Sequence, residues 1–431
     1  MRRRIRRGPL RWLLPGMQIK RWLLMLVVGI TLFSLGCAYL LRVLYDVRPL
    51  PAAFYYLTLQ FIPRWGRALL LGIVGGTLVA MGLVRLNRAL LAPFLRPGQE
   101  KVVDALYRHR QQQRGPKVVV IGGGTGLSVL LRGLKEYTDH LTAIVTVADD
   151  GGSSGRLRQE LGVLPPGDFR NCIVALSESE GLTSRLFQYR FGEGVGLNGH
   201  SFGNLFIVAM AGVTGSFEQA LVESSRVLAV RGRVLPSTLQ NVTLCADLWE
   251  EREGVEAGWR RVEGESSITR HLGTIERVFL EPEGVSAYPE AVKAILEADL
   301  IVAGPGSLYT SVLPNLLVPD VTQAIRASRA TKVYVCNVAT QPGETDGYSV
   351  GEHVLALQKH VGHDVFPSAL ANNRFLGPVA GPSWGLEWVR LPQKEEKGYR
   401  LMTADLVDEE FPWRHDSHKL ARCLMELYEA Q

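Results

Sequence analysis

Several predicted strands in this sequence end in residues whose types could bind a ligand. At the first of these strand ends, a run of glycines follows the buried strand directly. The apolar run 117–121 leads into a glycine turn, and an apolar helical pattern follows at 127–135. Glycines let a backbone approach an anion, and a helix N-terminus offers free N–H groups at its positive dipole end. The pattern predicts a phosphate site, with a merely tight turn as the alternative. The turn consists of Gly122, Gly123, Gly124, Thr125 and Gly126.

This turn departs from the two common nucleotide-binding motifs. In the dinucleotide fingerprint the third glycine would fall at position 127, which is Leu127. A P-loop would need Lys followed by Ser or Thr after the last glycine, and the sequence has none there. The turn therefore favours a phosphate ligand but argues against NAD and a redox role.

A second predicted strand, 143–148, ends in the carboxylates of Asp149 and Asp150. Carboxylates at the carboxyl end of a strand bind ribose hydroxyls or a hard cation such as Mg²⁺, so both are candidate metal ligands and catalytic groups. An Arg can donate two hydrogen bonds to phosphate. A plain surface turn is the alternative. The next loop supplies the donors Gly152, Ser153, Ser154 and Arg156.

Two polar turns precede predicted helices farther along the chain. Asp168, Arg170 and Asn171 precede an apolar helix at 172–178, and Ser201 and Asn204 precede a helix at 205–211. Asp168 is a candidate cation ligand, and Arg170 could stabilise phosphate charge. The letters around Ser201 match GxSxG, but the hydrolase motif needs a strand before it, and here a glycine-rich loop precedes it. Ser201 and Asn204 are therefore predicted to be binding donors.

Two further strands end in polar residues. The run 299–303 leads into Gly304, Gly306, Ser307 and Tyr309, and the run 332–338 carries Asn337 at its end. In open α/β sheets, ligands bind outside the carboxyl ends of the parallel strands. We therefore expect all these junctions to form one site.

Three histidines, His353, His360 and His363, fall on one predicted helix and its end. No carboxylates lie near them at ligand spacing, so we expect solvated side chains rather than a metal site.

The elements that position these junctions predict an α/β fold, a doubly wound Rossmann-like parallel sheet over 117–431. Residues 241–281 interrupt the pattern, with two expected strands at 241–248 and 267–279 around a charged loop. We interpret this segment as a small antiparallel excursion that forms a surface flap.

Charge is distributed very unevenly along the chain. Residues 1–117 contain 20 of the 48 basic residues and three of the 42 acidic ones, which leaves 118–431 with a net charge of −11. An acidic globular part repels a phosphate backbone, so the composition excludes nucleic acid as a partner. The five cysteines are scattered without a CxxC pair, which argues against a disulfide framework and a zinc site.

The N-terminal region suggests a membrane anchor. Uncharged runs at 22–41 and 68–84 are near the length of a transmembrane helix, and residues 54–62 form an aromatic stretch between them. Basic residues are more numerous at 1–21 and in the linker 85–116 than between the runs. The positive-inside rule then predicts a two-span inner-membrane hairpin over 22–84, with both termini and the globular part in the cytoplasm and the linker at the inner leaflet.

Six motifs in a fixed order resemble the YvcK-like, or gluconeogenesis factor, branch of the CofD-like (2-phospho-L-lactate transferase) family. The ending Arg414-His415-Asp416 with Lys419 fits as well. The resemblance covers about 115–430. The motifs are Ile121–Gly126, Val147–Arg156, Pro166–Asn171, Ser201–Asn204, Gly304–Ser311 and Thr340–Thr345.

The resemblance implies a nucleotide-sugar ligand of the UDP-N-acetylglucosamine type and a regulatory role in cell shape and envelope growth on gluconeogenic carbon sources. Cell-wall machinery proteins and a second copy of the chain are expected partners. A Mg²⁺-dependent transferase acting on a phosphorylated substrate is the alternative, as the CofD relatives imply. An NAD-dependent oxidoreductase is a third hypothesis, which the glycine spacing disfavours.

Overall fold

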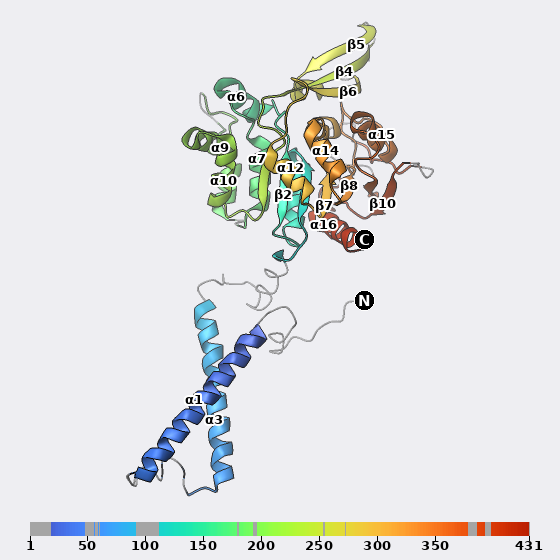
Figure 1. The fold of residues 1–431 in the computed structure, drawn as a ribbon. Helices are drawn as coiled ribbons and strands as arrows, with labels where there is room; N and C mark the ends of the chain where they lie inside the picture. The colour runs from blue at the N-terminus through green and yellow to red at the C-terminus, as the bar shows by residue number, and fades with distance from the viewer. Residues whose placement is uncertain are drawn as a thin grey trace. The chain divides into compact units, whose positions relative to one another are not determined.

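The chain forms two compact units, Met1–Arg110 and Gln111–Gln431 (Figure 1). The computed structural model describes residues 19–47, 61–91, 112–178, 181–192, 196–252, 255–271, 273–377, 386–392 and 398–430, with Tyr56 and Leu59. Most of the basic N-terminus, most of the aromatic stretch 54–62 and linker residues 92–111 lie outside the described residues.

The described part of the first unit contains the helices α1 (Ile19–Val47) and α3 (Arg64–Leu91). Over the described residues, neither these helices nor any other combines the length and the apolar content that a membrane crossing requires. The predicted two-span anchor and inner-membrane localisation were therefore wrong. Each helix continues beyond its uncharged run into charged residues. These are Lys20, Arg21, Arg42 and Asp46 in α1, and Arg64, Arg67, Arg85 and Arg88 in α3.

The second unit is built on a seven-stranded sheet with the order β10-β9-β8-β7-β1-β2-β3. Every adjacent pair is parallel, which confirms the predicted doubly wound α/β sheet. The strands are β1 (Val118–Gly122), β2 (Leu141–Val145), β3 (Arg233–Pro236), β7 (Leu300–Ala303), β8 (Thr331–Val335), β9 (Ser368–Asn372) and β10 (Arg400–Ala404).

Strand β1 lies at the centre of the core. Its register places Val120 beside Ala143 of β2 on one side and Val302 of β7 on the other. All residues of β1, β2 and β7 are buried, as expected for parallel strands with both faces covered. From β1 the chain winds outward to β2 and β3 and then returns to β7 on the opposite side. The β1–β7 pair is therefore the topological switch point.

Helices cover both faces of the sheet (Figure 1). On one face α5 packs between α7 and α16, and elsewhere α12 packs against α14. The main helices are α5 (Gly124–Leu134), α6 (Gly152–Leu161), α7 (Gly167–Leu176), α8 (Leu182–Gln188), α9 (Phe202–Thr214), α10 (Phe217–Val227), α12 (Pro289–Leu296), α14 (Pro319–Ala327), α15 (Val350–Val361) and α16 (Ser417–Glu429). Short turns α11 (Glu265–Ile268), η3 (Leu308–Val312) and α13 (Leu313–Leu316) complete the set.

The flap is a three-stranded antiparallel sheet with the order β5-β4-β6. It comprises β4 (Thr243–Arg252), β5 (Val255–Glu263) and β6 (Thr274–Glu281). The antiparallel excursion is confirmed, but the charged loop expected between two strands is itself mostly strand β5. Of its described side chains, Arg260, Arg261 and Glu263 are exposed while Val262 is buried, so β5 contacts the core at Val262 and is otherwise largely solvated.

Candidate functional site

Two glycine loops meet at the switch point. The loop after β1 contains Gly126, where an added Cβ would lie 2.5 Å from the carbonyl oxygen of Pro305 in the loop after β7. An added Cβ on Gly306 would lie 3.4 Å from the carbonyl oxygen of Gly123. At Gly126 only glycine allows the two backbones to approach this closely, and the loops after β1 and β7 meet there.

Helix α5 begins inside its glycine loop. Gly124 has φ +63°, a conformation that favours glycine, and it is the first residue of the helix. The residue before it, Gly123, provides no side-chain cap. The helix therefore begins three residues before the predicted 127, and its first N–H groups lie within the Gly-rich turn itself.

The loop after β7 is held by an amide side chain from β8's end. The Asn337 side chain accepts a hydrogen bond from the N–H of Gly306 at 3.1 Å and donates one to its carbonyl at 2.9 Å. Asn337 also donates to Gln341, whose amide donates to the hydroxyl of Ser307 at 2.6 Å. These contacts join the ends of β7 and β8 in one hydrogen-bond network.

Asp168, at the start of α7, lies against the first glycine loop. It accepts a hydrogen bond from the backbone N–H of Gly124, and an added Cβ on Gly123 would be 2.6 Å from its Oδ2. Burial, and then the nearby charge of Asp149, raise the pKa of Asp168 to about 7. A carboxyl group thus occupies the position at the N-terminus of α5 that the sequence assigned to a phosphate.

The carboxylates after β2 contact the flap. Burial raises the pKa of Asp149, whose side chain hydrogen-bonds with those of Ser154 and Glu265 and accepts from the N–H of Gly151. Asp150 accepts a hydrogen bond from the N–H of Ser266 at 2.8 Å. Burial and then the charge of Asp149 raise the pKa of Glu265 to about 9. Turn α11 therefore closes over the second junction.

A further polar group surrounds the first turn of α9. Ser201 caps this helix by accepting from the N–H of Asn204, and Arg170 donates to the Ser201 hydroxyl. Asn204 donates to the hydroxyl of Ser153 at 3.1 Å, which links α9 to α6. Burial lowers the pKa of Arg170 to about 10. Asn171 accepts from the same guanidinium at 2.8 Å.

Two predicted site residues point elsewhere. Tyr309 is buried, and its hydroxyl lies 3.0 Å from that of Tyr348. Arg156 is exposed and donates to the carbonyl of Asn198 at 2.6 Å, at the edge of the α9 group.

The sequence predicted solvated side chains for three histidines, and this prediction was wrong for two of them. His353 is buried, with Nδ1 2.8 Å from the carbonyl of Ser349. His360 uses Nε2 to accept from the N–H of Val278 in the flap. Their ring nitrogens contact backbone groups because both lie on the inner face of α15.

Sequence reasoning missed several residues of the site. Glu265 lies more than a hundred positions after Asp149 in a charged segment, and no local signal connects the two. Asn315 is buried and donates to the carbonyls of Gly122 and Ser311 at 3.0 and 2.8 Å. Glu344 accepts from the hydroxyl of Thr310 at 3.0 Å, and burial raises its pKa to about 7. Glu344 lies within a motif already singled out, so its buried carboxyl could have been suspected.

The donor chemistry near Asp149 suits a hard cation, because Mg²⁺ prefers carboxylate oxygens. Among the described residues, however, no group of three or more His, Cys, Asp or Glu side chains is arranged to hold a metal ion. Asp149 and Glu265 are instead in contact through a hydrogen bond.

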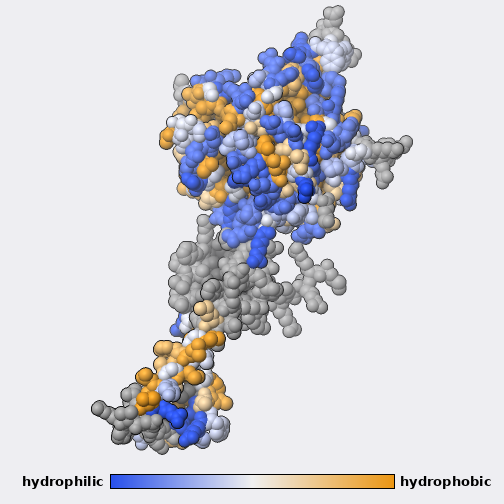
Figure 2. All heavy atoms as spheres, viewed as in Figure 1, coloured by the Kyte–Doolittle hydropathy of each residue, from blue (hydrophilic) through white to orange (hydrophobic). Residues whose placement is uncertain are grey.

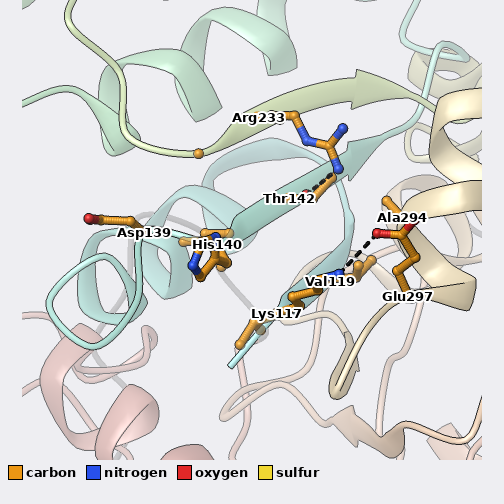
Figure 3. A pocket seen from close by; sticks show the side chains of 11 residues that line it. Lys117, Val119, Asp139, His140, Thr142, Arg233, Ala294 and Glu297 are labelled. Carbon is orange, nitrogen blue, oxygen red and sulfur yellow. Dashed lines mark hydrogen bonds and ion pairs between the residues drawn. The ribbon is translucent and has the colours of Figure 1, made fainter. Parts of the chain in front are cut away.

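A hollow of about 330 Å³ lies at the opposite edge of the sheet, around the starts of β1 and β2 (Figure 3). Its basic side chains already have partners. Lys117 pairs with Glu297 at 3.0 Å, and Arg233 donates to the hydroxyl of Thr142 at 3.5 Å. Ligands of open α/β sheets bind at the other edge, so we do not assign a function to this hollow.

Comparison with known proteins agrees with this geometry. The family model described as 2-phospho-L-lactate transferase CofD matches residues 118–429. The chain belongs to the CofD family, in its gluconeogenesis factor branch. A gluconeogenesis factor from Bacillus subtilis is 46% identical over 72% of this chain and 98% of its own. The resemblance inferred from the motifs is thus confirmed.

Relatives differ in how much of the N-terminal unit they share. A Nostoc relative is 46% identical over 97% of this chain and 92% of its own. A crystal structure of a UPF0052-family protein from Bacillus halodurans is 46% identical, with a TM-score of 0.67, and covers 72% of this chain and 99% of that one. The globular part therefore exists in a relative as nearly the whole protein.

Proposed function

We propose that this CofD-family protein is a regulatory protein that binds a nucleotide sugar of the UDP-N-acetylglucosamine type. The observation that carries the proposal is the convergence of two glycine loops at the switch point, Gly123–Gly126 after β1 and Gly304–Ser307 after β7. Backbone N–H groups of such loops are suited to a diphosphate, and a switch point is where open α/β sheets bind nucleotides.

The polar groups around these loops have capacity left for a ligand. Among the buried atoms of the described residues, Arg170 Nε and Asn204 Oδ1 lack a hydrogen-bond partner. An unpaired buried polar atom costs about 1–3 kcal/mol, so a ligand that satisfies both would gain from doing so. We assign Arg170 to phosphate charge and Asn204 to a hydroxyl or amide of the sugar.

The carboxylates would then contact the ribose or an accompanying cation. Asp149 and Asp150 follow β2 beside the glycine loops, a position from which acidic residues accept from ribose hydroxyls. Asp168 lies at the N-terminus of α5, so a diphosphate that uses those N–H groups must displace its carboxyl or meet it protonated. The biological role in cell shape and envelope growth under gluconeogenic conditions is proposed from family membership.

A second candidate function is a Mg²⁺-dependent transfer reaction on a phosphorylated substrate. The observation that favours it is the group of carboxyls with raised pKa values, Asp149, Asp168 and Glu265, beside a phosphate-type loop. Perturbed carboxyls gather at catalytic sites more often than elsewhere. Mg²⁺ held by Asp149 and Asp150 would neutralise phosphate charge, while Arg170 would orient the transferred group.

Calorimetric titration of Gln111–Gln431 with UDP-N-acetylglucosamine, with and without Mg²⁺, tests the first proposal. We expect specific binding that the Asp149→Ala variant loses and the exposed Asp364→Ala variant keeps. Equal affinity for unrelated nucleotides would refute the nucleotide-sugar assignment. Product formation from the bound ligand with Mg²⁺ and an acceptor would instead support the transferase.

A further inference from the structure

His200 is a buried side chain of the type that gains and loses a proton near neutral pH. It lies in the loop immediately before α9. Nδ1 of its ring is 3.0 Å from the hydroxyl of Ser153, near the start of α6. The same hydroxyl accepts a hydrogen bond from Nδ2 of Asn204 at 3.1 Å. Side chains from α6, from this loop and from α9 therefore meet at one hydroxyl group.

Two arginines hold the backbone of the loop that carries His200. Arg156 of α6 donates to the carbonyl of Asn198 at 2.6 Å, and Arg190 donates to the carbonyl of Gly199 at 3.1 Å. Gly199 has φ +77°, and an added Cβ there would lie 3.1 Å from the Arg156 guanidinium. These contacts fix the backbone from which the His200 ring extends to α6.

The directions of the hydrogen bonds follow from the number of protons available. A serine hydroxyl has one proton to donate. Because the Asn204 amide donates to Ser153, the Ser153 proton is left for Nδ1 of His200. Nδ1 can accept it only when it carries no proton itself. Burial, and then the charge of Arg156, lower the pKa of His200, which favours the neutral ring.

This arrangement decides which atom of the Asn204 amide is left for a ligand. Nδ2 is used by Ser153, whereas Oδ1 is buried and has no hydrogen-bond partner among the residues that the structure describes. If Nδ1 of His200 carried a proton, it would donate to Ser153, and the hydroxyl proton would be free for Asn204 Oδ1. The amide would then turn over and leave its N–H groups open in place of its oxygen.

The first turn of α9 connects this amide to the rest of the candidate site. Figure 2 shows apolar surface on the side of the second unit where Figure 1 shows α9, whereas Ser201 and Asn204 at the start of this helix are buried. Ser201 accepts hydrogen bonds from the N–H of Asn204 and from Arg170. The open oxygen of Asn204 therefore belongs to the same group of side chains as the arginine assigned to phosphate charge.

We propose that His200 is a positioning residue that fixes Asn204 with its Oδ1 open to the ligand, so that the group recognised there is a hydrogen-bond donor, a hydroxyl or an amide N–H of the sugar. This inference rests on the proposed function. A proton on Nδ1 reverses the hydrogen bonds and removes the acceptor, so protonation of His200 lowers the affinity for the ligand. The charged groups around His200 are Arg156 and Glu160 of α6 and Arg190; Arg156 opposes protonation and Glu160 favours it.

Calorimetric titration of Gln111–Gln431 with UDP-N-acetylglucosamine tests the proposal. This part of the chain corresponds to nearly the whole of the Bacillus halodurans protein, so it can be studied alone. His200→Phe removes the acceptor, whereas His200→Asn restores a side-chain oxygen at the position of Nδ1. At about pH 8 we expect the Kd to rise about tenfold in His200→Phe and to stay within about threefold of the wild type in His200→Asn.

His363→Phe is the matched control. His363 also contacts a side-chain amide, that of Gln358, but it lies just after α15 and outside the candidate site. This variant should leave the Kd unchanged. A His200→Asn variant that binds as weakly as His200→Phe overturns the proposal, because the acceptor at Nδ1 would then not be what the ligand site requires.

The pH dependence separates positioning from a purely structural role. Between about pH 8 and about pH 5, the wild type should lose more affinity than His200→Asn, because only the wild type can gain a proton at this position. The carboxyls Asp149, Asp168 and Glu265 titrate in both proteins. Equal losses in the two proteins overturn the proposal.

Nitrogen-15 spectra of the imidazole rings test the hydrogen-bond direction without any ligand. Comparison with His200→Asn identifies the His200 signals. At about pH 8 we expect a proton on Nε2 and none on Nδ1, and a protonated Nδ1 overturns the proposal whether or not a nucleotide sugar binds. A wild type that binds no nucleotide sugar is a separate result. It refutes the proposed function and the ligand assigned to Asn204, while the spectrum still decides the direction of the bonds.

Discussion

Replacement of Asp168 by Asn removes a largely buried carboxyl whose charge is unfavourable in the folded protein. The pKa of Asp168 is raised from 3.8 to about 7, because burial and then the charge of Asp149 disfavour ionisation. A raised folded-state pKa contributes stability that is fully present below the unfolded pKa and is lost as pH rises through the folded pKa. The wild type should therefore lose stability between pH values of about 4 and about 7.

The magnitude follows from the shift. Each pKa unit corresponds to about 1.36 kcal/mol, so the interval from about pH 5 to the folded pKa of about 7 represents about 3 kcal/mol. The side chain keeps partial exposure, and solvent screening reduces this to about 2 kcal/mol. Asn can still accept the hydrogen bond from Gly124, so Asp168→Asn should stabilise the protein by about 2 kcal/mol more at about pH 8.5 than at about pH 5.

Urea unfolding of Gln111–Gln431 at the two pH values measures this difference. Asp364→Asn is the matched control. Its pKa is lowered by the hydrogen bond from Arg326, so the stability that its charge contributes is lost only at a pH below this window. The control should therefore follow the pH dependence of the wild type. Titrating groups distant from Asp168 are common to the variants and cancel in the comparison, whereas the coupled carboxyls Asp149 and Glu265 titrate more easily once Asp168 has no charge.

One result would refute the reasoning. If the wild type and Asp168→Asn lost the same free energy of unfolding between the two pH values, the carboxyl would not be held protonated by its surroundings. The electrostatic account of the junction between α5 and α7 would then fail.

Two further predictions concern the loops at the switch point. Gly126→Ala would place a Cβ 2.5 Å from the carbonyl oxygen of Pro305. We expect the free energy of unfolding in urea to fall by about 1–3 kcal/mol and nucleotide-sugar binding to weaken. Gly181→Ala is the control, because Gly181 has open space around it, and it should change neither quantity. Asn337→Ala would remove both hydrogen bonds to Gly306. We expect the free energy of unfolding to fall by about 1–3 kcal/mol and the calorimetric Kd for the nucleotide sugar to rise. Unchanged values for both would contradict the positioning role of Asn337.

Much of the fold was readable because its signals are local. The apolar segments that form β1, β2, β7 and β8 each end in glycines or short polar residues. Adjacent residues are therefore sufficient to recognise such a strand-to-helix connection. The order of six junction motifs likewise indicated the family that the comparisons confirmed. Helix boundaries were predicted less accurately. Helices α5 and α7 begin before the predicted residues, because glycines and polar residues of the turns already belong to the helices.

The wrong predictions concern residues whose structure depends on packing against distant parts of the chain. The charged segment that was expected to be a loop is strand β5, because pairing with β4 satisfies its backbone hydrogen bonds while Arg260, Arg261 and Glu263 stay exposed. The uncharged runs of the first unit indicated a membrane anchor, but over the described residues no helix is both long enough and apolar enough to cross a membrane. His353 was expected in solvent, and packing of α15 buries it.

The sequence by itself determined the strands β1, β2, β7 and β8, the glycine turns and the family, because backbone conformation near a glycine or a buried run is decided by adjacent residues. Only the tertiary structure decided which side chains meet. It brought Glu265 of the flap against Asp149, placed the Asp168 carboxyl at the start of α5, and set the Tyr309 hydroxyl beside that of Tyr348. The burial and proximity that set the pKa values of these carboxyls arise from segments distant in sequence, so no local pattern records them.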